Sequence, residues 1–158
     1  MVEIRPARPE DCSRVRAFIL ELAEYERLAH SVTASESDVR RALFSAPPRA
    51  FCDLAWDGEE AVGFALWFYN FSTFVGRAGI WLEDLYVRPQ ARGSGVGKAL
   101  LAGLARRCRD EKLGRLEWAV LDWNAPSIAF YDSLGADALS DWTTRRLTGP
   151  ALARLAGD

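Results

Sequence analysis

The sequence has very few of the residues from which metal and redox sites are built. His30 is the only histidine, and the three cysteines, Cys12, Cys52 and Cys108, are widely spaced. Zinc sites use closely spaced cysteine and histidine ligands, so we predict no transition-metal site. Three cysteines within apolar patterns also do not suit a disulfide framework. We therefore expect buried thiols in a reducing, cytoplasmic compartment.

The chain also lacks an excess of one charge and a long apolar run. Its 20 basic and 22 acidic residues give a net charge of −2. Such a balance offers no broad attraction to nucleic acid or to an anionic membrane. No apolar run reaches the roughly 18 residues of a membrane-spanning helix, and the start of the chain lacks a signal-peptide pattern. We therefore expect small-molecule or protein partners, with no nucleic acid and no membrane.

The chain contains enough apolar side chains to form one hydrophobic core. It has 158 residues, of which 49% are hydrophobic, and this length is short for two ordinary domains. No internal repeat, low-complexity segment or linker interrupts it. We predict a single domain that spans residues 1–158.

Hydrophobic spacing and turn residues predict an α/β fold with the element order βααβββαβαβ. Strands are expected at about 2–5, 50–56, 61–69, 79–87, 115–121 and 143–147, and helices at about 9–29, 33–46, 95–110 and 124–134. A capping box of Thr33 and Glu36 is expected to start the second helix, and Asp57-Gly58 to form a hairpin turn. A short helix at 148–156 can end the chain. This order predicts a mixed sheet with helices on both faces.

A glycine-rich loop, Arg92-Gly93-Ser94-Gly95-Val96-Gly97, joins the fourth expected strand to the third expected helix. The first turn of a helix has unpaired N–H groups and the positive end of the helix dipole. Glycines let a phosphate come close to those groups. The loop therefore predicts a phosphate ligand, and the alternative is a tight turn that binds nothing.

Two common phosphate loops do not fit the spacing. A Walker A loop needs glycine at position 92 and serine or threonine at position 99, where Arg92 and Ala99 stand. A Rossmann fingerprint that starts at Gly93 needs glycine at position 98, which is Lys98. The remaining pattern, Arg-x-x-Gly-x-Gly, resembles the acetyl-CoA pyrophosphate loop of the GNAT acetyltransferases.

Three further segments extend this resemblance to nearly the whole chain. They are Glu21–Glu26 (ELAEYE), Leu82–Val87 (LEDLYV) and Trp123–Tyr131 (WNAPSIAFY). Together they resemble the spermidine/spermine and thialysine branch of the GNAT family. The resemblance implies a GNAT-like fold, N-acetyl transfer from acetyl-CoA to a small primary amine, and a homodimer.

The resemblance also implies the catalytic roles. An alkyl ammonium is almost fully protonated at neutral pH, so the enzyme must accept a proton before the nitrogen can attack a thioester. Glu83 is the expected base, acting through a water, and Tyr131 is the expected acid that protonates the leaving thiolate. By the same resemblance, the backbone N–H of Leu85, beside a strand bulge, is expected to polarise the thioester carbonyl. Because side chains alternate along a strand, Glu83 and Asp84 should face opposite ways unless the strand bulges.

The expected acetyl-CoA site combines a strand edge, the glycine loop and the last core helix. Its residues are Leu85, Tyr86, Val87, Arg92, Gly93, Ser94, Gly95, Val96, Gly97, Lys98, Asn124, Ser127 and Tyr131. Asn124 and Tyr131 are almost two helical turns apart and share one helix face. Asn124 can alternatively be only a helix N-cap, and the two roles are compatible.

The expected amine site consists of Tyr25, Glu26, Phe74, Glu83 and Asp84. Ser72-Thr73 resembles the thialysine-type sequence, whereas polyamine acetyltransferases carry an acidic residue in this region, and Phe74 replaces a tryptophan. A missing carboxylate removes Coulomb energy for a polycation. We therefore predict weak polyamine activity and better turnover of an amino-acid-like or smaller primary amine.

Three alternatives remain open from the sequence. One is an N-acetyltransferase that acts on proteins or peptides. The second is a non-catalytic acetyl-CoA sensor, although a sensor would not need Glu83, Asn124 and Tyr131 together. The third is an adaptor whose glycine loop binds a nucleotide phosphate.

Overall fold

The computed structural model describes residues 2–157, which form two compact units. The first unit ends at Ala119, and the second begins at Val120. The expectation of one domain over the whole chain stays a prediction, and each unit is described by itself.

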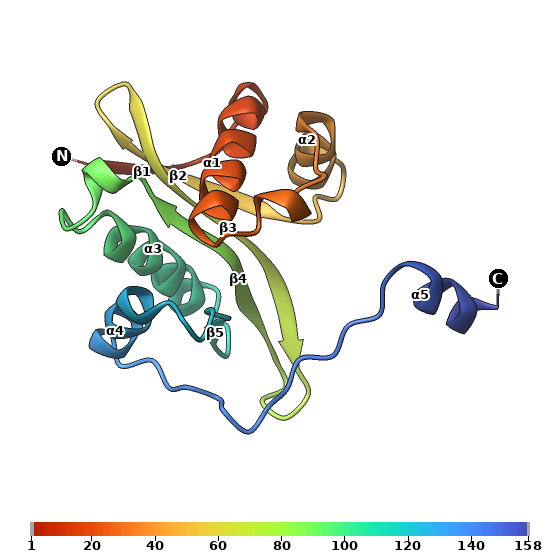
Figure 1. Cartoon of the computed structure of the whole chain (residues 1–158). Coiled ribbons are helices and arrows are strands. Elements are labelled where there is room, and N and C mark those ends of the chain that lie inside the picture. Colours follow the sequence, from red (N-terminus) through yellow and green to blue (C-terminus); the bar gives the residue numbers. More distant parts are fainter. Residues whose placement is uncertain (1, 158) are drawn as a thin grey trace. The chain divides into compact units, whose positions relative to one another are not determined.

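The first unit is built on a five-stranded mixed sheet (Figure 1). Its strands are β1 (Val2–Pro6), β2 (Phe51–Asp57), β3 (Glu60–Ser72), β4 (Arg77–Val87) and β5 (Leu116–Trp118). They lie in sequence order, antiparallel except for the parallel pair of β4 and β5. The Asp57-Gly58 turn between β2 and β3 is confirmed, and Gly58 has the positive φ of 60° that such a turn requires.

Helices cover both faces of this sheet, as the sequence predicted. α1 (Cys12–Tyr25) and α2 (Glu36–Phe44) pack on one face, and α3 (Val96–Asp110) packs on the other (Figure 1). Short 3₁₀ turns lie at Pro9–Asp11, Ala29–Ser31 and Pro89–Ala91. The core under α1 and α2 comprises Val15, Phe18, Leu22, Val39, Leu43, Cys52, Leu54, Trp56, Ala61, Phe64 and Tyr86.

The predicted boundaries of the first two helices need correction. α1 ends at Tyr25 rather than near residue 29, because Arg27 has a φ of 62° that a right-handed helix cannot continue through. The N-cap residue of α2 is Ser35, not Thr33. The Oγ of Ser35 accepts a hydrogen bond from the N–H of Asp38 at 3.1 Å, and Asp38 Oδ2 accepts from the Ser35 N–H at 2.9 Å. The capping box is therefore shifted by two residues.

The second unit contains α4 (Ala125–Ser133) and α5 (Gly149–Ala156). Both helices were predicted, and Gly135 follows α4 with a φ of 79°, as expected of a residue that ends a helix. The predicted strand at 143–147 is wrong, because within the described chain this segment pairs with no strand and takes no regular structure. The strand predicted at 115–121 is shortened to Leu116–Trp118, the only residues that pair with β4.

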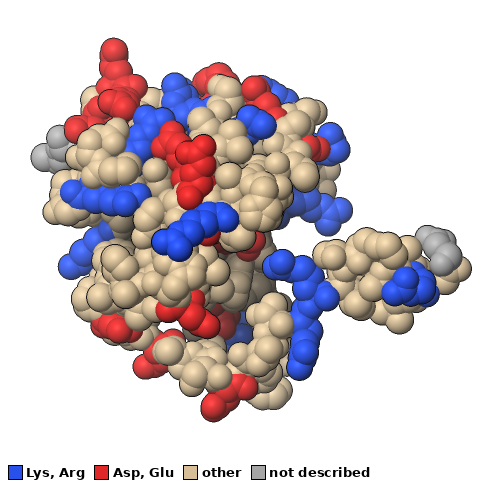
Figure 2. Space-filling model, in the orientation of Figure 1, with Lys and Arg blue, Asp and Glu red and all other residues tan. Residues whose placement is uncertain are grey.

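Charged side chains of both signs are interspersed over most of the face shown in Figure 2, in keeping with the net charge of −2. No helix among residues 2–157 is long and apolar enough to cross a membrane.

Candidate active site

A β-bulge in β4 lies at the centre of the candidate site. In the pairing of β3 with β4, Leu66 lies opposite Asp84 and Trp67 lies opposite Leu82, so Glu83 is the extra residue. Such an insertion reverses the alternation of side chains beyond it. The sequence left this point open, and the structure shows that the strand does bulge.

The bulge turns Asp84 toward the face that α1 and α2 cover. Before the bulge, Leu82 lies opposite Trp67, whose ring is 5.0 Å from the guanidinium of Arg107 on α3. Beyond the bulge, Asp84 lies in one row with Leu66 and with Cys52, which belongs to the core under α1 and α2. Directly opposed residues point to the same face, so Leu82 and Asp84 point to opposite faces although they are two residues apart.

Glu83 faces the same side of the sheet as Asp84. Trp81 precedes Leu82 and must point away from α3. The indole Nε1 of Trp81 donates a hydrogen bond to Glu83 Oε2 at 2.9 Å, which places that carboxylate beside it. Trp81 was not predicted as a hydrogen-bond partner of Glu83, although its spacing of two residues along the strand could have indicated it.

Three carboxylates therefore gather near the end of α1. Burial, together with the smaller effect of the neighbouring negative charges of Glu83 and Glu26, raises the pKa of Asp84 to about 7. Burial also raises the pKa of Glu26, the C-cap residue of α1. This cluster favours a bound cation over a neutral molecule, and it includes three of the five residues predicted for the amine site.

The edge of β4 beyond the bulge is open. β5 pairs only with Ile80–Leu82, so on that side residues 83–87 have no strand partner in the described chain. On the other side, the pairing with β3 continues, and Leu85 lies opposite Ala65. The main chain of Leu85, Tyr86 and Val87 can therefore take up an extended ligand by strand addition, as the sequence predicted for this segment.

The glycine loop leads from this edge into α3. Gly93 and Gly95 have φ values of 78° and 87°, and Gly95 is the N-cap of α3. A Cβ at either position would meet no other atom within 4 Å, so the backbone conformation requires glycine and the space beside the loop is open. Ser94 Oγ donates to the carbonyl of Ala91 at 2.7 Å, which holds the loop. Buried Val96 anchors the helix start.

Arg92 connects the glycine loop to the end of α1. Its Nε donates a hydrogen bond to the Val87 carbonyl at 2.8 Å. Its guanidinium carbon lies 5.0 Å from the ring centre of Tyr25 and 5.5 Å from that of Tyr86. The structure thus brings a residue predicted for the amine site into contact with one predicted for the cofactor site. The contact between Tyr25 and Arg92 could not be predicted from the sequence, because these residues are far apart along the chain.

The remaining predicted cofactor residues lie elsewhere along the chain. Gly97 and exposed Lys98 are in the first turn of α3. In the second unit, Oδ1 of buried Asn124 accepts the N–H of Ser127 at 3.4 Å, which confirms its role as the N-cap of α4. Tyr131 follows on the same helix.

Phe74 lies at the turn between β3 and β4, with 98% of its side chain exposed. Arg77 and Asp84 are seven positions apart along β4, a span of about 23 Å at the usual strand rise. Within one chain, the structure therefore does not bring Phe74 to the carboxylate cluster.

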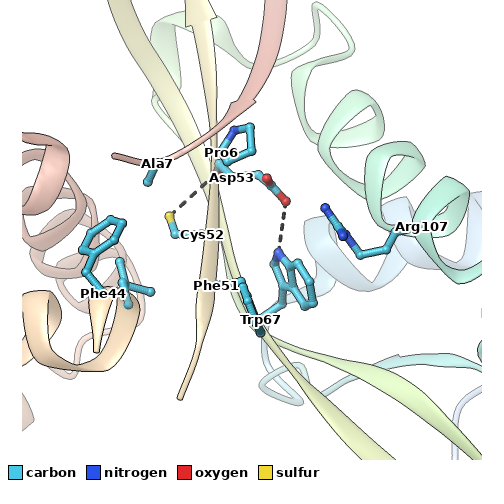
Figure 3. Close-up of a pocket in the computed structure, with 9 residues that line it drawn as sticks. Pro6, Ala7, Phe44, Phe51, Cys52, Asp53, Trp67 and Arg107 are labelled. Atoms are coloured by element: carbon cyan, nitrogen blue, oxygen red, sulfur yellow. Dashed lines mark hydrogen bonds between the residues drawn. The ribbon is translucent and has the colours of Figure 1, made fainter. Parts of the chain in front are cut away.

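A separate cavity of about 110 Å³ lies beside the end of β1 (Figure 3). Its lining comprises Pro6, Ala7, Leu43, Phe44, Phe51, Cys52, Asp53, Trp67 and Arg107. Trp67 Nε1 donates to Asp53 Oδ2 at 3.0 Å, and Arg107 points toward this pair. Burial raises the pKa of Asp53, which the Trp67 hydrogen bond and the Arg107 charge partly oppose. None of the predicted site residues lines this cavity.

The first unit thus combines a glycine-rich helix start, a strand edge without a strand partner in the described chain, and a cluster of carboxylates. The model of the acetyltransferase (GNAT) family matches residues 16–136, and the chain belongs to this family. The protein is therefore an acetyltransferase.

Two relatives are similar to this chain in sequence, and one solved structure is similar to it in fold. The chain is 37% identical to the thialysine N-epsilon-acetyltransferase of Bos taurus, over 99% of this chain and 98% of the relative. It is also 37% identical to the enzyme of the same name from Caenorhabditis elegans, with the same coverage. An integron cassette protein from the mobile metagenome of V. cholerae has the same fold, with a TM-score of 0.82, 27% identity and coverage of 99% and 98%.

Proposed function

We propose that this protein transfers an acetyl group from acetyl-CoA to the primary amine of a small molecule, by direct attack of the amine on the thioester. The preferred acceptor is a thialysine-like or lysine-like amino acid. The observation that supports this most directly is the cluster of Glu26, Glu83 and Asp84 beside the open edge of β4.

Acetyl-CoA fits the chemistry of the loop and strand edge. The N–H groups at the start of α3 and the charges of Arg92 and Lys98 would hold the diphosphate. Gly93 and Gly95 leave the approach to these N–H groups open. The main chain of residues 85–87 would pair with the extended arm, and the N–H of Leu85 would polarise the thioester carbonyl.

The amine would bind as an ammonium ion among the carboxylates and lose a proton there. Its nitrogen would then attack the thioester carbonyl, and the thiolate would take a proton from Tyr131. The resemblance assigns the base to Glu83, and its neighbour Asp84 faces the same side of the sheet. The family resemblance also assigns Asn124, Ser127 and Tyr131 to the binding of the cofactor.

The proposed acceptor follows from the number of carboxylates in the cluster. Glu26, Glu83 and Asp84 suffice for one or two ammonium groups. The names of the relatives point to the same substrate class. Spermidine, with three ammonium groups, would gain less Coulomb energy here than in a more acidic site.

A free-thiol release assay with acetyl-CoA tests this function. The acceptors are thialysine, lysine, ornithine, spermidine and a short peptide with a free N-terminus. We expect the amino acids to be turned over with the highest kcat/KM. Preference for the peptide would favour the protein-directed alternative, and binding of acetyl-CoA without turnover of any amine would favour a sensor.

Tyr131→Phe tests the proposed acid, with Tyr69→Phe as the matched control. Tyr69 donates its hydroxyl to Glu111 at 2.7 Å on the α3 side of the sheet. We expect Tyr131→Phe to lower kcat by about 10²-fold or more, as for loss of a general acid, and Tyr69→Phe to stay near wild type. Full turnover by Tyr131→Phe would refute the assignment.

We also propose a homodimer in the cytoplasm. The three cysteines are free thiols, which suits a reducing compartment. Large apolar side chains of the second unit are exposed, which suits an interface.

A further inference from the structure

We infer that Glu21 and Arg88 form a positioning pair for the proposed acetyl transfer. Their ion pair fastens helix α1 to the chain segment that leads from the open edge of β4 to the glycine loop. It thereby holds the proposed amine site and the proposed cofactor site in one arrangement. This inference rests on the proposed function, because both sites belong to it.

Arg88 directly follows β4 and precedes the glycine loop. Its backbone N–H donates to the carbonyl of Val62 at 2.9 Å, so the chain stays attached to β3 beyond the end of β4. The next residues, Pro89–Ala91, form a 3₁₀ turn, and Arg92 then begins the loop. A shift of Arg88 would therefore move proposed cofactor contacts on both sides of it.

The guanidinium of Arg88 is held by three parts of the first unit. Its Nε donates to Glu21 Oε2 at 3.1 Å, and its Nη2 donates to Glu21 Oε1 at 2.9 Å. Its Nη1 donates to Glu60 Oε1 at 3.1 Å and to the Ala61 carbonyl at 3.2 Å. Its carbon lies 4.9 Å from the ring centre of Phe18. This arrangement needs the planar fork of an arginine, because a lysine ammonium cannot make the same set of parallel bonds.

Glu21 belongs to a stripe of α1 that faces the end of β4. Phe18, Glu21 and Tyr25 follow one another at intervals of three and four residues, so they lie along one side of the helix. Phe18 and Glu21 contact Arg88, and the ring of Tyr25 lies 5.0 Å from the guanidinium of Arg92. Two arginines that are four residues apart therefore hold the same stripe of α1.

The end of α1 carries the part of the proposed amine site that does not belong to β4. Glu26 is the C-cap residue of α1, and its negative charge acts on Asp84 of β4. Transfer between two bound substrates requires that the reacting groups be placed accurately, and a misplacement of about 1 Å can cost a large part of the rate. An ion pair that holds α1 on the end of β4 keeps these carboxylates together.

Glu21 and Glu60 offer a matched comparison. Each pairs with the same guanidinium, at 2.9 Å for Glu21 and 3.1 Å for Glu60, and each contributes one negative charge. Glu60, however, lies at the start of β3, so its ion pair does not involve α1. Its side chain is also 62% exposed, against 30% for Glu21. Removal of the Glu60 charge should therefore leave the attachment of α1 intact.

The first test compares Glu21→Gln with Glu60→Gln in the thiol-release assay with acetyl-CoA and the preferred amino acid. We expect Glu21→Gln to lower kcat/KM by about 10-fold, because the end of α1 is no longer held in place. Glu60→Gln should stay within about 2-fold of wild type, as for the loss of an exposed ion pair. Arg88→Lys should fall between Glu21→Gln and wild type, because it keeps the charge but not the fork.

A double-mutant cycle on coenzyme A affinity separates positioning from mere stabilisation of the fold. In the wild-type background, Tyr25→Leu should weaken coenzyme A binding about 5-fold, through the loss of its stack on Arg92. In the Glu21→Gln background, the same substitution should have almost no further effect, because the stack is already displaced. In the Glu60→Gln background, it should keep its full effect. Calorimetric titration measures the affinities, and a cooperative melt shows that each variant is folded.

The outcomes distinguish this inference from the proposed function. Wild-type protein that neither binds coenzyme A nor releases thiol with any amine would refute the proposed function. If wild-type protein is active and Glu21→Gln behaves as Glu60→Gln does, only the present inference fails. It also fails if Tyr25→Leu has the same effect in the wild-type and Glu21→Gln backgrounds, since the ion pair would then not position Tyr25.

Discussion

Asp84 is an ionisable residue whose burial has a cost in stability. Its pKa in the folded protein is raised to about 7, whereas an aspartate in an unfolded chain titrates near 4. The folded state therefore binds this proton more tightly than the unfolded state does. As pH rises from about 4 to about 7, this group lowers the free energy of unfolding, and above about 7 its full cost is present.

Asp84→Asn removes that cost, so we expect the variant to be more stable than wild type at about pH 8, by at most about 4 kcal/mol. The advantage should shrink as the pH is lowered to about 4, where the carboxyl is protonated in the folded state and about half protonated in the unfolded state. Chemical denaturation at the two pH values measures this difference. Asp57→Asn is the control, because Asn-Gly forms the same tight turn as Asp-Gly. A stability difference between Asp84→Asn and wild type that does not change with pH would contradict the burial of the Asp84 charge.

Substitutions of Tyr25 can test the contact between the proposed amine site and the proposed cofactor site. Its ring lies 5.0 Å from the guanidinium of Arg92, which is proposed to bind the diphosphate. Loss of such a stack costs roughly 1 kcal/mol, so we expect Tyr25→Leu to weaken coenzyme A binding about 5-fold. Tyr25→Phe keeps the ring and should bind nearly as wild type does. Calorimetric titration with coenzyme A decides the matter, and equal affinities for both variants would show that the stack does not position Arg92.

At the scale of secondary-structure elements, the features that could be predicted from the sequence are those that neighbouring residues determine. The hairpin at Asp57-Gly58, the start of α3 at Gly95 and the cap of α4 at Asn124 each depend on a few neighbouring residues. The bulge in β4 was expected only from the family resemblance. Local residue chemistry could not predict it, because it exists only in the register between β3 and β4. The segment at 143–147 was misjudged for a similar reason, since a short segment forms a strand only where a partner strand is available.

The start of α2 shows how two equally plausible local patterns are decided. Thr33 with Glu36 and Ser35 with Asp38 both have capping-box spacing, and the structure uses the second pair. We expect Ser35→Ala to lower the free energy of unfolding by about 1 kcal/mol, and Thr33→Ala to change it by less than about 0.5 kcal/mol. Chemical denaturation of both variants provides the check. The reverse order of effects would indicate that the helix starts at Thr33.

At the scale of the whole molecule, the apolar surface of the second unit is the feature that supports the proposed homodimer. α5 buries none of its side chains in the described chain. Trp142 and Leu155 are 79% and 74% exposed, and Leu139, Leu147 and Leu152 are also exposed. Monomeric proteins seldom expose so many large apolar groups within a short segment.

We therefore expect a dimer of twice the 17.6 kDa chain mass in light scattering after size exclusion. The combined variant Trp142→Ser, Leu152→Ser and Leu155→Ser should shift the protein toward monomer, because each substitution removes apolar area from the proposed interface. The first unit should keep its own melting transition, since none of these residues belongs to its core. Leu28→Ser, at an exposed apolar position of the first unit, serves as the control and should remain dimeric. A wild-type protein that stays monomeric at about 100 μM, well above the Kd of a stable dimer, would refute the homodimer and leave this apolar surface to a different partner.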